Sequence, residues 1–286
     1  MQIASTSTQR TYRYLRLSIV GAVFLLFVAL AITIARFGPM LSVSAAHYTP
    51  ARDIFVGSIF AVALALVALS GRSLSQALLD YAAILAPVIA VVPAPLEAGQ
   101  VPDSPGDVAG VQVGILSLLV VGIIGVVVAF VLALVQRTLT LPLGVALGVA
   151  AAIVLAVTAW WLLAPDSFLA WGHIVAAFAF FGLVAAVSAL AAWTVDETSN
   201  DAGAAARATY RVVYSVIAAG ILISLALVLL VIILKLQGVD LVQSTGIPLV
   251  FIGEAAALIL FAAFWLVQTI ELWDEPDPRL LAVEGP

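Results

Sequence analysis

The residue with the clearest chemical potential is Glu254, an acidic side chain inside the apolar segment 247–270. Such a segment can cross a bilayer, because a spanning helix needs roughly 20 predominantly apolar residues. A charged side chain at the centre of a spanning helix costs about 2.5 kcal/mol or more, so ionisable residues inside spans usually have a partner or a function. Gly253 and Ala257 flank Glu254, and this pair of small residues allows a neighbouring helix to approach closely.

Four further polar residues are expected on the side of the membrane where this segment begins. His173 lies five residues into the segment that starts at Phe168. With a rise of about 1.5 Å per residue, His173 and Glu254 lie at similar depths of roughly 8 and 10 Å. Another apolar segment begins with Arg52 and Asp53, and His47 lies just before it. We therefore predict an outward-facing polar site formed by Glu254, His173, Asp53, Arg52 and His47.

These residue types leave three functions open. The favoured hypothesis is binding or transport, in which Glu254 and His173 relay a proton or cation, or recognise a small polar solute or a lipid headgroup. Imidazole and carboxylate also bind zinc, which activates water in hydrolases. The third alternative is a structural or accessory subunit of a membrane complex, in which the polar groups hold helices together. An enzyme is not the favoured interpretation.

No metal and no cofactor is predicted for this site. The histidines and acidic residues form no metal-binding motif such as His-Glu-x-x-His. The chain has only two histidines, and His47 falls in a loop, whereas bundle cofactor sites are built from side chains on facing helices. There is no cysteine, which excludes thiolate metal sites and disulfides.

The composition places these residues in a membrane. The chain is 64% hydrophobic and 9% charged, whereas about a quarter of the residues in a soluble domain are charged. The apolar runs are continuous and longer than the alternating strands of about ten residues found in outer-membrane barrels. No basic patch indicates nucleic-acid binding. We predict an all-α integral membrane protein whose partners are the lipid bilayer, a small polar ligand or headgroup, and a membrane-protein partner.

Eight transmembrane helices are predicted, and they form a single polytopic domain over residues 1–273, followed by a short disordered cytoplasmic tail at 274–286. The second and third spans are near the lower length limit, and Pro87 is expected to kink the third. The first segment is longer than the core of a signal peptide and is expected to be retained. The predicted spans are Leu17–Phe37, Ile54–Ser70, Gln76–Val92, Val111–Val135, Pro142–Leu163, Phe168–Trp193, Val212–Leu236 and Ile247–Ile270.

The positive charges predict the orientation. With both termini in the cytoplasm, eight of the eleven Lys and Arg residues face the cytoplasm, as the positive-inside rule favours. An even number of spans also requires both termini on one side. The expected location is the plasma membrane, as a multi-pass protein of the bacterial inner membrane type. Segment 93–110 is expected to be an irregular external loop, 194–210 a polar cytoplasmic loop, and Trp265 an anchor near the inner interface.

The segment 41–57 reads LSVSAAHYTPARDIFVG. It resembles a stretch of the DUF998-like families of uncharacterised bacterial polytopic membrane proteins, which have Ser-x-Ser, an aromatic pair before Thr, and then Arg-Asp-x-Phe-Val-Gly. His47 replaces the first aromatic residue of that pattern. The resemblance covers 17 residues and implies a polytopic membrane protein without an assigned activity.

A more distant similarity is to the membrane hydrolases related to alkaline ceramidases and progestin/adipoQ receptors. Those proteins are similar in having about seven helices and a metal site of His, Asp and Ser. This chain lacks a third histidine and the His-x-x-x-His pair. The departure argues against a zinc amidase and leaves the metal-dependent membrane hydrolase as the enzyme alternative.

Overall fold

The computed structural model describes residues 3–71, 73–95, 105–198, 203–241 and 245–273. The predicted all-α fold is confirmed, since this part of the chain forms eight α-helices and no strand. A short 3-10 helix, η1, follows the first helix. The elements are α1 (Ile3–Phe37), η1 (Ser44–Tyr48), α2 (Arg52–Ala68), α3 (Leu74–Val91), α4 (Pro105–Val135), α5 (Leu141–Leu163), α6 (Pro165–Thr198), α7 (Ala204–Leu236) and α9 (Leu249–Glu271).

Seven of the described helices are long and apolar enough to cross a membrane, which is the architecture of a polytopic membrane protein. The remaining helix, α2, has 17 residues, the lower limit for a span. It packs between α1 and α3. The second predicted span is therefore present as a helix of marginal length inside the bundle.

Several helices extend beyond their apolar segments. α1 begins at Ile3 rather than Leu17, and α4 begins at Pro105 inside the segment predicted to be irregular. α6 continues to Thr198 and α7 begins at Ala204, so most of the predicted loop 194–210 is helical. An apolar run marks only the membrane-spanning length of a helix, and the helix itself can continue beyond that run. At the start of α7, Ala and Arg are good helix formers that extend the helix. The predicted tail, 274–286, lies outside the described residues.

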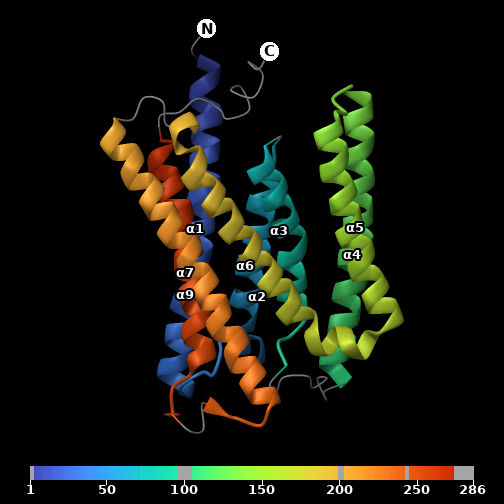
Figure 1. The fold of residues 1–286 in the computed structure, drawn as a ribbon. Coiled ribbons are helices and arrows are strands. Elements are labelled where there is room, and N and C mark those ends of the chain that lie inside the picture. The colour runs from blue at the N-terminus through green and yellow to red at the C-terminus, as the bar shows by residue number, and fades with distance from the viewer. Residues whose placement is uncertain (1–2, 72, 96–104, 199–202, 242–244, 274–286) are drawn as a thin grey trace.

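Six helices form the main bundle, and the α4–α5 hairpin lies beside it against α3 and α6 (Figure 1). Consecutive long helices run in opposite directions, so the start of α1 and the end of α9 lie at the same end (Figure 1). At that end the Arg13 guanidinium lies 4.5 Å from the centroid of the Trp273 ring. This arrangement agrees with chain ends on one side of the membrane, and the cytoplasmic assignment stays a prediction.

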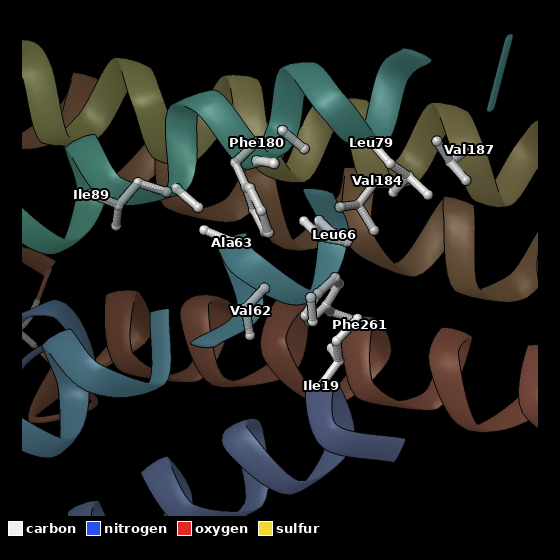
Figure 2. Close-up of a cluster of buried hydrophobic side chains, with 14 of the residues drawn as sticks. Ile19, Val62, Ala63, Leu66, Leu79, Ile89, Phe180, Val184, Val187 and Phe261 are labelled. Atoms are coloured by element: carbon white, nitrogen blue, oxygen red, sulfur yellow. The ribbon is translucent and has the colours of Figure 1, made fainter. Parts of the chain in front are cut away.

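The core lies where α1, α2, α3, α6 and α9 meet. Figure 2 shows side chains from these helices pointing toward one another, among them Ile19, Leu66 and Phe261. Trp265 is 1% exposed and packs edge-on against Phe261 and Phe264. The prediction that Trp265 anchors the chain at the membrane interface is therefore wrong. Its ring faces the bundle, because α9 turns this aromatic face inward.

α9 lies unusually close to α7 at Gly253. A Cβ atom built on Gly253 would lie 2.6 Å from Val228 Cγ2 and 3.3 Å from the Ser224 carbonyl oxygen. Gly253 and Ala257 are both buried, so the small pair that flanks Glu254 does pack against a neighbouring helix. The contact fixes the rotation of α9 and hence the direction of Glu254.

The α2–α3 turn is held by local hydrogen bonds. Ser73 and Gln76 form a capping box at the start of α3, and the Ser70 hydroxyl donates to the Asp80 carboxylate over 2.7 Å. α3 continues through Pro87 and ends at Val91, where Val92 is the C-cap residue. The carbonyl groups at a helix end lack partners inside the helix. Val92 thus presents an acceptor at the end of the bundle that holds η1.

Candidate functional site

The Glu254 carboxylate is bound by the segment that connects α1 to η1. Its Oε2 atom accepts hydrogen bonds from the backbone N–H groups of Val43 and Ser44, over 2.5 and 3.1 Å. Its Oε1 atom lies 2.9 Å from the Ser44 hydroxyl oxygen. The first N–H groups of a helical turn have no partner within that turn, so they are available to a carboxylate. Glu254 thus receives its partners from η1 rather than from α7.

The segment around η1 is held in place by apolar packing and by one backbone bond. Met40, Val43 and Ala46 are buried with Leu30 and Phe55 in a small cluster between α1, α2 and α9. The Phe251 N–H group donates to the Leu41 carbonyl over 3.1 Å and joins this segment to the start of α9. These contacts hold the loop between α1 and α2 in the position that places Ser44 against Glu254.

His173 reaches the same serine from α6. The imidazole is 3% exposed, its Nε2 atom lies 2.9 Å from Ser44 Oγ, and its Nδ1 atom lies 2.7 Å from the Val92 carbonyl oxygen. A carbonyl oxygen can only accept a hydrogen bond, so Nδ1 must carry the hydrogen. The end of α3 therefore selects the tautomer of His173 and orients its ring toward Ser44.

Ser44 is the functional residue that sequence reasoning missed. Its hydroxyl joins two side chains that are 129 and 210 residues away in the chain, His173 and Glu254. The Ser-x-Ser pattern near His47 could have indicated a serine at the site, but it contains two serines, Ser42 and Ser44, and does not indicate which one contributes. The structure distinguishes them: both serines line the cavity, but the Ser42 hydroxyl accepts from the Ala45 N–H group, while the Ser44 hydroxyl lies within hydrogen-bond distance of Glu254 and His173.

The other predicted site residues lie on η1 and in the first turn of α2. Arg52 and Asp53 are exposed in the first turn of α2, whose buried face runs through Phe55 and Ser58. His47 is buried and packs edge-on against Phe55 with ring centroids 6.5 Å apart. The structure therefore brings Glu254 and His173 together through Ser44, whereas the side chains of Arg52 and Asp53 are exposed.

A cavity of about 530 Å³ extends from this network into the bundle. Ser44, His173 and Glu254 all line this cavity. Most of the remaining wall is apolar and comes from α1, α2, α3, α6, α7 and α9, including Leu26, Ile59, Ala177, Phe181, Val228 and Leu258. Two charged residues, Lys235 in the last turn of α7 and Asp240 just beyond it, also line the cavity.

The described residues contain no group of three or more His, Asp or Glu side chains arranged to hold a metal ion. Between Glu254 and His173 lies a serine hydroxyl, which is a hydrogen-bonding group in this geometry. The arrangement is suited to hydrogen bonding and proton sharing.

A second polar cluster lies at the opposite end of the bundle. The Tyr214 hydroxyl donates to the Glu271 carboxylate, and both interact electrostatically with the buried guanidinium of Arg16. Arg16 was counted from sequence only as a cytoplasmic cation. The cluster joins α1, α7 and α9, and a structural role in fixing these three helices accounts for it.

No protein-family model, no curated protein and no solved structure matches this chain. The resemblance of segment 41–57 to the DUF998-like families therefore stays a prediction.

Proposed function

We propose that this membrane protein binds an amphiphile, with the polar head at the Glu254–Ser44–His173 network and the apolar part along the cavity wall. The observation that carries the proposal is that Ser44, His173 and Glu254 line one cavity whose remaining wall is mostly apolar. Its volume of about 530 Å³ lies within the roughly 300–1,000 Å³ of pockets that enclose small molecules.

An amphiphile fits this cavity better than a small polar solute does. A polar group buried without hydrogen bonds costs roughly 1–3 kcal/mol in proteins. Away from the network the cavity wall is mostly apolar, and its uncharged polar residues are Ser42, Ser58 and Ser224. An apolar chain satisfies that wall, and a head with a hydroxyl, carboxyl or ester group satisfies the network. Of the two ligand classes predicted from sequence, the lipid headgroup is therefore favoured.

The position of the network supports the same ligand class. Glu254 lies in the second turn of α9, and Lys235 in the last turn of α7, so both are near the ends of their helices. Headgroups reside at this depth, at the boundary between hydrocarbon and water. We propose that this boundary is the outer one, as the distribution of Lys and Arg predicts.

The hydrolase alternative has less support. The described residues supply no metal-ligand set. In a serine hydrolase, backbone N–H groups near the nucleophile must be free to stabilise an oxyanion. Here the N–H groups of Val43 and Ser44 are occupied by the Glu254 carboxylate. The geometry favours binding over acyl transfer.

Native mass spectrometry of the purified protein with added lysophosphatidylcholine, fatty acid and fatty alcohol of one chain length tests the proposal. We expect one-to-one binding to the wild type and at least tenfold weaker binding to the variant Ala177→Phe, which fills the cavity. Val175→Phe is the matched control, because Val175 lies on the same helix but is 49% exposed. Equal binding to both variants would place the amphiphile on the outer surface and overturn the proposal.

A further inference from the structure

The centre of the network is a chain of three atoms: Glu254 Oε1, Ser44 Oγ and His173 Nε2. Glu254 Oε1 and His173 Nε2 each lie 2.9 Å from the Ser44 hydroxyl oxygen, and both separations are those of hydrogen bonds. The other polar atoms are already assigned. Glu254 Oε2 accepts two backbone N–H groups, and His173 Nδ1 donates to the Val92 carbonyl.

The two hydrogen bonds of this chain of atoms require one hydrogen more than the Ser44 hydroxyl supplies. Two hydrogen bonds need two hydrogens, and the Ser44 hydroxyl provides only one. If Glu254 were ionised and His173 neutral, one of the two bonds would lose its hydrogen. The second hydrogen therefore lies on Glu254 Oε1 or on His173 Nε2.

We propose that Glu254, Ser44 and His173 form a proton relay that holds one shared proton and passes it through the serine hydroxyl. In the first arrangement, the Glu254 carboxyl O–H donates to Ser44 Oγ, and the Ser44 O–H donates to His173 Nε2. In the second, Nε2–H donates to Ser44 Oγ, and the Ser44 O–H donates to the Glu254 carboxylate.

The conversion between the two arrangements is balanced. The O–H bonds of Glu254 and Ser44 break, and an O–H bond on Ser44 and an N–H bond on His173 form. No electron pair leaves the network, and the net charge of the two titratable side chains is zero in both arrangements. The relay therefore moves charge within a buried site without leaving it with an unbalanced charge.

The charged surroundings of the relay are few. His47 on η1 interacts electrostatically with His173. Lys235 from α7 and Asp240 from the segment after it line the same cavity. The cavity-lining residues from α1, α2 and α3 carry no charge. All three relay residues also line the cavity. A molecule bound there that contacts Glu254 can therefore exchange a proton with His173 through the Ser44 hydroxyl, and one that contacts His173 can exchange a proton with Glu254.

The test is the ¹⁵N NMR spectrum of histidine-labelled protein in bilayers. The chain has two histidines, so His173 is assigned by loss of its signals in His173→Asn, or by elimination in His47→Phe. We expect His173 Nδ1 to be protonated in the wild type and Nε2 to be the atom that shares the proton. A protonated Nε2 with a bare Nδ1 would overturn the proposal without any further variant.

Two variants test the relay itself. In Glu254→Gln, the amide N–H₂ group donates to Ser44 Oγ, so the serine donates to Nε2 and His173 is fixed as the neutral Nδ1–H tautomer. In Glu254→Gln we expect the ¹⁵N chemical shift of His173 Nε2 to lose the contribution of the shared proton. Ser44→Thr keeps the hydroxyl, and we expect it to retain that contribution.

The same Glu254→Gln change in a Ser44→Ala background should leave the Nε2 signal unaltered, because the link is gone. An equal effect of Glu254→Gln with and without the serine hydroxyl would show that no proton passes through Ser44. If Ser44→Ala does not fold, the tautomer and the Glu254→Gln shift decide the matter.

Discussion

At the scale of single residues, Ser44 gives Glu254 and His173 a common partner. Each side chain alone would be a polar group in an apolar bundle, and such groups are tolerated when hydrogen-bonded. The Glu254 side chain lies within 3.1 Å of two backbone N–H groups and the Ser44 hydroxyl, and the two imidazole nitrogens of His173 lie within hydrogen-bond distance of Val92 and Ser44. The network is therefore a stabilising feature of the fold as well as a candidate site.

Removing the carboxylate should cost much more than neutralising it. In Glu254→Ala, the two backbone N–H groups of Val43 and Ser44 lose their acceptor, and each unsatisfied buried group costs about 1–3 kcal/mol. We expect a loss of about 2–5 kcal/mol on this basis, because water satisfies part of the set. Glu254→Gln keeps an acceptor and should lose less than half of that. Thermal unfolding in detergent compares them, and equal losses would contradict the geometry of the network.

At the scale of helices, the network depends on the rotation of α9, and Gly253 sets that rotation through its contact with α7. In Gly253→Ala, the new methyl group would meet Val228 at 2.6 Å and the Ser224 backbone at 3.3 Å. We expect a loss of about 1–3 kcal/mol, as for other overpacked sites. Gly148→Ala on α5 is the matched control, since nothing lies within 4 Å of its Cβ position. Unfolding midpoints that shift equally would contradict this close approach.

The cluster at the opposite end of the bundle makes a separate prediction about α1, α7 and α9. Glu271→Ala removes the carboxylate that accepts from Tyr214 and interacts electrostatically with the buried Arg16 guanidinium, and should cost about 1.5–3 kcal/mol, as for hydrogen bonds to charged groups. Tyr214→Phe removes only a hydroxyl that donates to Glu271, and should cost about 1 kcal/mol. Denaturant titration of both variants shows which one loses more unfolding free energy. A larger effect for Tyr214→Phe would show that Arg16 does not depend on Glu271.

At the scale of the whole molecule, the helices of the described residues alternate in direction, and η1 and the start of α9, which carry Ser44 and Glu254, lie at the end of the bundle away from the start of α1 and the end of α9 (Figure 1). The lack of native cysteine allows this orientation to be measured by labelling. We expect Leu41→Cys, 60% exposed beside η1, to react with an impermeant maleimide added outside intact cells. Leu139→Cys, between α4 and α5, should react only after the membrane is opened. The reverse pattern would place the network on the cytoplasmic side.

Much of the architecture could be predicted because membrane helices are specified by local hydrophobicity. The helices follow from apolar length, and seven of those described are long and apolar enough to cross a membrane. The shared membrane side of the chain ends and the matching depths of Glu254 and His173 stay predictions. The role of Ser44 could not be predicted, because it depends on the path of a five-residue turn between α1 and α2. The inward face of Trp265 depends on the rotation of α9, which the large aromatic residues in the sequence did not reveal.

The central claim is that one cavity holds an amphiphile with its polar head at Ser44, His173 and Glu254. The most direct test compares the affinities of dodecanol and dodecyl methyl ether for the purified protein and for Ser44→Ala, by calorimetry. A hydroxyl head can both donate and accept, whereas the ether only accepts, and the lost hydrogen bond corresponds to about threefold to tenfold in affinity. We predict that preference for the alcohol in the wild type and its loss in Ser44→Ala. Equal affinities of the wild type for both compounds would mean that the network does not bind the head, and would contradict the account.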